Sequence, residues 1–172
     1  MNAGLSGSGD SSARVVVIGI GNEFRRDDGA GPAVVRAASR LLPETVEVIE
    51  LDGEPARLME AWTGADVAYV VDAARAGATP GSVHRFDATC AGLPAWAARG
   101  GTHALGVGAA VDLARALDRL PPRLVVYGVE GARFDEGDGL TPEVQAAVGI
   151  AAARLVAEVE VAARGATGAG GR

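Results

Sequence analysis

The chain has 172 residues, of which 48% are hydrophobic and 22% charged, and these values are typical of one globular domain. Its formal net charge of −6 argues against a nucleic-acid partner, because an acidic surface repels a phosphate backbone. The single cysteine, Cys90, excludes an intrachain disulfide and a four-cysteine zinc site, and no base lies near it in the sequence to make it a nucleophile.

The two ends of the chain are rich in glycine, with serine at the amino-terminal end. Residues 1–13 predict a disordered leader and residues 164–172 a flexible tail, so the globular domain is expected over residues 14–163. The leader has no Lys or Arg before Arg14 and does not resemble a signal peptide. Every apolar run is too short, or too interrupted by charge, to span a membrane, so we expect a cytoplasmic protein without a membrane partner.

Strand-like and helix-like segments alternate between these ends. Apolar or alternating runs predict strands over residues 14–20, 45–51, 65–73, 82–87 and 123–129, the fourth of them at a sheet edge. Helical spacing and capping residues predict helices over residues 28–42, 54–62, 102–120 and 142–163, the last with Thr141 as its N-cap. This alternation predicts an α/β fold: a single three-layer αβα domain with a mostly parallel, doubly wound sheet of about five strands.

Within these elements, the spacing of apolar residues on the first helix predicts one buried side, formed by Val34, Val35, Ala38 and Leu41. His84 lies in the predicted edge strand and is expected to be solvated.

The segment GIGNEF after the first strand matches a dinucleotide-binding loop only in part. Gly19 and Gly21 match the first two glycines of that motif, but Phe24 stands at the third, where a bulky residue would block close packing of the helix on the strand. The sequence has no Walker A lysine, no G-x-S-x-G and no H-E-x-x-H. These absences argue against a nucleotide-binding protein or a small-molecule hydrolase.

Three residues with metal-binding side chains lie at the ends or beginnings of predicted strands and helices. Asp28 follows the first strand, Asp72 ends the third, and His103 opens a helix. If the strands are parallel, all three meet at the carboxyl edge of the sheet, where α/β proteins bind ligands. Two carboxylates and an imidazole suit a divalent metal. Taken singly, Asp27 and Asp28 are explained as helix N-terminal charges, Asp72 as a loop-closing acceptor and His103 as a cap, but their convergence favours a site.

Five segments, in order, resemble the hydrogenase maturation endopeptidases, which process the large subunit of [NiFe] hydrogenases. The segments are GIGNEFRRDDGAGP, the Asp52-Gly53 pair, VVDAARAG, GTHALG and YGVEG…GLTPEV. Together they cover nearly everything from Arg14 to about Val159. The ordered set is specific to this family, whereas any one segment alone is a weak signal.

The resemblance implies an activity and a set of ligands. Family members remove a short C-terminal extension from the large-subunit precursor after nickel insertion, and the family's nickel-contacting residues correspond to Asp28, Asp72 and His103. Asp28 stands where some members have glutamate. The nickel is expected to arrive with the substrate, although the site may be empty or hold another divalent metal, and the catalytic residues stay unassigned. Asp52, after the second strand, is a candidate either for supporting a metal ligand or for proton transfer. The alternative is a non-proteolytic nickel-binding checkpoint module that acts on the same precursor.

Overall fold

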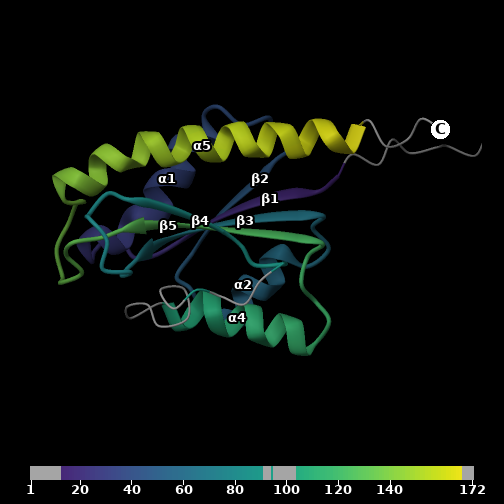
Figure 1. The fold of residues 1–172 in the computed structure, drawn as a ribbon, viewed down its shortest axis with the longest axis horizontal. Helices are drawn as coiled ribbons and strands as arrows, with labels where there is room; N and C mark the ends of the chain where they lie inside the picture. Colours follow the sequence, from purple (N-terminus) through teal and green to yellow (C-terminus); the bar gives the residue numbers. More distant parts are fainter. Residues whose placement is uncertain (1–12, 91–93, 95–103, 168–172) are drawn as a thin grey trace, which may run out of the picture.

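The computed structural model describes residues 13–90, 94 and 104–167, which form a sheet between two layers of helices (Figure 1). The strands are β1 Val15–Ile20, β2 Glu47–Leu51, β3 Val67–Ala74, β4 Val83–Asp87 and β5 Arg123–Glu130. The helices are the 3-10 helix η1 Arg26–Gly29, then α1 Ala30–Ser39, α2 Pro55–Trp62, α4 Ala104–Ala116 and α5 Pro142–Thr167. The predicted three-layer α/β fold is therefore confirmed.

The five strands form one sheet in the order β2-β1-β3-β5-β4. Strands β2, β1, β3 and β5 run parallel, and β4 runs antiparallel to β5 at the edge. Strands β1 and β3, in the middle, are buried over almost their whole length, as their continuous apolar runs predict. Strand β2 forms the other edge and mixes exposed with half-buried residues, in agreement with its alternating sequence.

The two faces of the sheet have separate cores. Tyr69 and Val71 of β3 pack in one core with α1 and α5, and Ala68 and Val70 pack in the other with α2 and α4. Because successive residues of a strand face opposite sides of the sheet, Asp72 belongs to the face that α2 and α4 cover. Asp72 is paired in register with Gly128 of β5, close to the carboxyl end of both strands.

Helix α1 approaches the sheet so closely that only glycine fits at one point of contact. A Cβ atom at Gly31 would lie 2.2 Å from the carbonyl oxygen of Ile20 and 2.5 Å from that of Val71. Phe24, which stands where a dinucleotide-binding loop has its third glycine, lies on the surface with 66% of its area exposed. The close contact of the helix with the sheet is made seven residues further along the chain, at Gly31.

The Gly31→Ala variant should lose roughly 3 kcal/mol of stability, because the new methyl group meets two backbone carbonyls that cannot move without distorting β1 and β3. Urea unfolding followed by circular dichroism measures this loss. Gly149→Ala on α5 is the matched control: nothing lies within 4 Å of its Cβ position, so the change should stabilise the helix by about 0.5–1 kcal/mol. Similar stabilities for the two variants would contradict the close contact at Gly31.

Several element boundaries differ from the predicted ones. The segment from Asp28 to Leu42 begins within η1, and α1 ends at Ser39, so Leu41 is 65% exposed rather than buried beside Val34. Helix α5 continues to Thr167, beyond its predicted end at about Ala163. Nearly all of the predicted leader, residues 168–172 of the predicted tail, and His103 lie outside the described residues. None of the helices described here is long and apolar enough to cross a bilayer.

Candidate functional site

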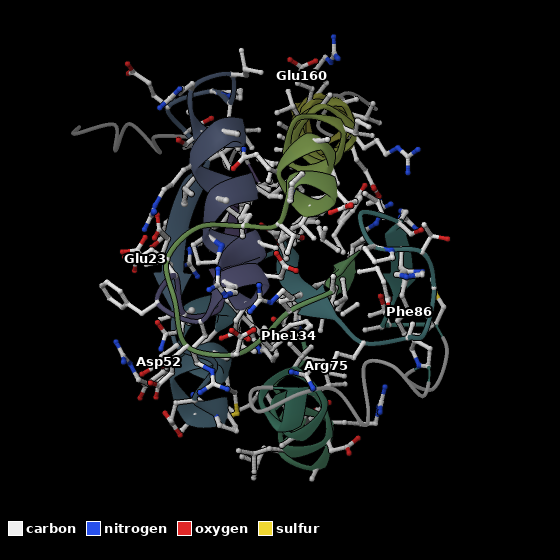
Figure 2. The ribbon with its side chains drawn as sticks, turned by 90° about the vertical axis from the view of Figure 1, so that its left-hand side faces the viewer. Glu23, Asp52, Arg75, Phe86, Phe134 and Glu160 are labelled. Carbon is white, nitrogen blue, oxygen red and sulfur yellow. The ribbon has the colours of Figure 1, made fainter. Side chains whose placement is uncertain are left out.

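Asp28 and Asp72 lie at the carboxyl edge of the parallel strands, the side of the molecule that faces the viewer in Figure 2. Asp28 is 4% exposed and Asp72 is 6% exposed. The pKa of Asp72 is raised to about 7, mainly by burial and to a smaller extent by the negative charge of Asp28, although a hydrogen bond from the Ala73 backbone partly offsets the rise. The structure thus brings two of the three predicted ligands together, and we call Asp28 and Asp72 the carboxylate pair.

The position of Asp28 depends on the turn that follows β1. The backbone N–H of Asn22 donates to Oδ2 of Asp28 at 3.0 Å. At Gly21 the chain has φ +143°, and a Cβ atom there would lie only 1.8 Å from the carbonyl oxygen of Asp28. Because only glycine permits both the φ value and this contact, Gly21 lets the turn fold back and place η1 against the end of β1.

Asp72 is held by the strand itself. The backbone N–H of Ala73 donates to its Oδ1 at 2.8 Å, and within the described part of the chain no hydrogen-bond donor reaches Oδ2. Because the side chain of Asp72 is largely buried, its charged form is costly unless a proton or a cation accompanies it. The site therefore favours either the protonated acid or a bound positive charge.

His103 lies outside the described residues, and α4 begins directly after it at Ala104. Helix α4 leads into the amino end of β5, so its own first residue lies at the carboxyl edge of the sheet (Figure 1). The helix also covers the sheet face to which Asp72 belongs. Considering only the described residues, no three His, Cys, Asp or Glu side chains are grouped closely enough to hold a metal ion.

Asp52 lies at the same edge but is engaged elsewhere. Its Oδ2 accepts a hydrogen bond from Arg57 at 3.3 Å, and its side chain is 62% exposed. A surface pocket of about 350 Å³ has both Asp52 and Asn22 in its lining. Asp52 is thus near the turn that holds Asp28, in an exposed ion pair with Arg57. The other residue considered at the outset, Cys90, is exposed.

Asp27 has a role that the sequence did not predict. Its side chain is fully buried and accepts hydrogen bonds from the backbone N–H groups of Ala132, Arg133 and Thr141 at 2.7–2.9 Å. The hydroxyl of Thr141, expected to cap α5, also donates to Asp27 at 3.0 Å. Asp27 is therefore the anchor of the loop between β5 and α5, rather than merely a charge at the start of a helix. The only sequence signal was its place beside Asp28.

Glu130, at the end of β5, is a second buried anchor that the sequence did not reveal. It is 3% exposed and accepts hydrogen bonds from the backbone N–H groups of Ala76, Gly77 and Ala78 at 2.8–3.2 Å. Its Oε2 also lies 3.2 Å from Nε2 of His84. The expectation that His84 is simply solvated was wrong, because this ring faces the loop after β3 and contacts a buried carboxylate.

Comparison with known proteins agrees with this architecture. A family model described as hydrogenase maturation protease (HycI) matches residues 32–158. The hydrogenase expression/formation protein HupD of Thiocapsa roseopersicina is 28% identical over 138 residues, which are 78% of this chain and 62% of that protein. The chain thus spans less than two thirds of that relative's length.

Two solved structures show the same fold. The hydrogenase maturating endopeptidase HybD from E. coli superposes with a TM-score of 0.74 at 26% identity, over 86% of this chain and 93% of that one. The [NiFe] hydrogenase maturation protease HybD from Thermococcus kodakarensis gives a TM-score of 0.65 at 24% identity, over 85% and 98% of the two chains. With a family model matching most of its length, this chain belongs to the hydrogenase maturation protease family.

Proposed function

We propose that this protein is an endopeptidase that removes the C-terminal extension of a [NiFe] hydrogenase large-subunit precursor after nickel insertion. In this proposal the nickel belongs to the substrate and is the element that the enzyme recognises, and the reaction takes place in the cytoplasm. Membership of the family supports the general activity. The observation that carries the specific proposal is the buried carboxylate pair at the carboxyl edge of the sheet.

The carboxylate pair fits a cation. Burial is the main cause of the raised pKa of Asp72, the negative charge of Asp28 adds to it, and a divalent ion between the two carboxylates would compensate both charges. His103 is the proposed third ligand, because it directly precedes Ala104 at the start of α4. Carboxylates and an imidazole bind nickel, zinc or iron, so the protein ligands alone do not select the metal.

Selection for nickel would then come from the precursor. Three protein ligands leave positions that groups of a partner can fill, and the thiolates of the precursor bind nickel more firmly than carboxylates do. A nickel ion held in this way supplies a Lewis acid for the scissile carbonyl or for the attacking water. The protein's own part is to hold the ion: the Asn22 N–H orients Asp28, and the Ala73 N–H orients Asp72.

Only the nickel-loaded precursor should therefore be cleaved. The test incubates the purified protein with nickel-loaded and nickel-free precursor and follows the shorter product by gel electrophoresis and mass spectrometry. Asp28→Ala, Asp72→Ala and His103→Ala should each lower the rate of cleavage by about 10³-fold or more, because each removes a ligand of the ion. Cys90→Ala should cleave normally, since its exposed thiol has no part in this mechanism.

Three other results of these assays would each support a different mechanism. Equal cleavage of both precursors would show that nickel is not the recognition element and would favour a metalloprotease with its own ion. Nickel-dependent binding without any cleavage would support the non-proteolytic checkpoint module. Loss of activity in Cys90→Ala would indicate a thiol mechanism.

A further inference from the structure

A surface pocket of about 600 Å³ lies between the loops that follow β3 and β5. We call it the Arg75 pocket, and its lining includes Arg75, Gly77, Glu130, Gly131, Arg133 and Phe134. Figure 2 shows Arg75 and Phe134 near the middle of the side that faces the viewer, with Asp52 to their left. No step of the proposed mechanism uses this pocket.

Both walls of the Arg75 pocket are connected to the carboxylate pair, one through the chain and the other through hydrogen bonds. Arg75 comes directly after β3, three residues beyond Asp72. The other wall is the loop that contains Phe134, and Asp27, the neighbour of Asp28, anchors the backbone of this loop. These connections fix the pocket relative to the site where the peptide bond is proposed to be cut.

The guanidinium of Arg75 is held by stacking. Its central carbon lies 3.8 Å from the centroid of the Phe134 ring. Gly131 supports the ring, because a Cβ atom there would lie 2.4 Å from Cζ of Phe134. Stacking fixes the plane of the guanidinium and leaves the N–H groups in that plane available to another partner, the arrangement that suits bidentate binding of a carboxylate.

Arg75 has no acidic partner within the part of the chain described, and Arg25 has none there either, but Arg25 donates to the carbonyl oxygen of Phe134 at 3.0 Å. At this edge, ion pairs of 2.6–3.3 Å join Arg26 and Arg133 to Asp135, Arg36 to Glu23 and Glu50, and Arg57 to Asp52. The two carboxylates that line the Arg75 pocket are occupied as well, Glu130 by backbone N–H groups and Asp135 by Arg26 and Arg133. The stacked guanidinium of Arg75 is left as a preorganised cation beside the site.

We propose that Arg75 is a specificity-determining residue that binds a carboxylate of the precursor segment next to the scissile bond. Phe134 is its positioning residue. The proposal rests on the proposed function, and it names the chemistry of one substrate group: a planar carboxylate, either from an Asp or Glu side chain of the extension or from the terminus of the precursor. Bidentate pairing with a stacked arginine adds geometric selectivity to charge attraction.

Arg75→Gln should raise KM for the nickel-loaded precursor about 10- to 100-fold and leave kcat within about 2-fold, since the lost charge-assisted bonds anchor the substrate away from the reacting atoms. Arg75→Lys keeps the charge without the planar fork, and Phe134→Leu removes the stacking platform, so both should give intermediate KM values. Arg154→Gln, which removes an exposed arginine from α5, should leave KM and kcat unchanged. A fall in kcat at constant KM in Arg75→Gln would overturn the proposal.

Variants of the precursor identify which of its carboxylates binds Arg75. Acidic residues of the extension are changed one at a time to the corresponding amide, and a precursor lengthened by two glycines moves the terminal carboxylate. One of these changes should raise KM as much as Arg75→Gln does, and combining it with Arg75→Gln should add nothing further. If each combination is instead additive, Arg75 binds no carboxylate of the precursor and the proposal fails.

Binding measurements separate this proposal from the proposed function. If the wild-type protein binds the precursor without cutting it, calorimetric Kd values replace KM, and Arg75→Gln should weaken binding by the same factor. In that case the cleavage proposal fails and the role of Arg75 stands. If Arg75→Gln binds and cleaves the precursor with wild-type constants, the role of Arg75 fails and the cleavage proposal stands.

Discussion

Asp72→Asn should abolish processing and, at the same time, make the protein more stable above pH 7. Burial and the charge of Asp28 raise the pKa of Asp72 from 3.8 to about 7 in the folded protein. Between these two pKa values the unfolded chain has released the proton and the folded protein still binds it, so the stability of the wild type falls as pH rises through this window. Asparagine carries no charge and avoids this loss. The expected gain is on the order of 2–4 kcal/mol above pH 7 and becomes small near pH 4.

Urea unfolding of both proteins in metal-free buffer, at intervals from pH 5 to pH 8, measures this difference. Asp112→Asn, which changes an exposed carboxylate on α4, is the control and should give no stability gain that depends on pH. Cleavage assays on the same Asp72→Asn sample test the other half of the prediction, because the variant lacks a proposed ligand. A variant that is less stable than the wild type at pH 8 would show that the Asp72 carboxylate is already compensated in the folded protein.

Asp27→Ala should have the opposite effect on stability. It leaves three backbone N–H groups without their acceptor, those of Ala132, Arg133 and Thr141, and the loss of a hydrogen bond to a charged group costs about 1.5–3 kcal/mol. We expect a loss of about 4 kcal/mol, which is a large fraction of the stability of a domain of this size. The loop over residues 131–140 should also become sensitive to proteolysis.

Asp28→Ala is the matched comparison, one residue away with the same change of side chain. It loses the hydrogen bond from the Asn22 N–H but also removes a negative charge near Asp72, so the expected loss is about 1 kcal/mol or less. Both variants should fail to process the precursor, Asp27→Ala because the loop over residues 131–140 and the turn that carries Asp28 are no longer held together, and Asp28→Ala because a proposed ligand is lost. Urea denaturation and limited proteolysis distinguish the two, and equal stabilities would contradict the anchoring role of Asp27.

The difference between these two aspartates marks the limit of what the sequence predicts. Strands β1, β3 and β5 followed from continuous apolar runs, and placing Asp28 and Asp72 at one edge followed from the rule for parallel sheets. Local pattern cannot tell Asp27 from Asp28, because the partners of Asp27 lie more than 100 residues further along the chain. His103 as a ligand stays a prediction.

Other features depended on packing that no local pattern contains. The role of Glu130 requires the loop after β3 to fold over the end of β5, and His84 reaches it only because β4 runs antiparallel to β5. The direction of an edge strand is not encoded in its alternation of apolar and polar residues. The close approach of α1 also lacks a local signal, because the glycine that permits it, Gly31, lies seven residues beyond Phe24, the position that corresponds to the third glycine of a dinucleotide-binding loop.

The anchoring of Asp27 has a consequence for the order of events during synthesis. Its acceptor oxygens are filled only by residues 132–141, which leave the ribosome long after η1 has been made. Strand β3, the central strand of the sheet, likewise cannot pair on both sides until its neighbour β5 has been made. Contacts this distant in sequence form late in folding, because the intervening chain must first be closed into a loop. A nascent chain that ends before Thr141 therefore lacks the completed turn that carries Asp28, and the site becomes competent only once most of the chain has emerged.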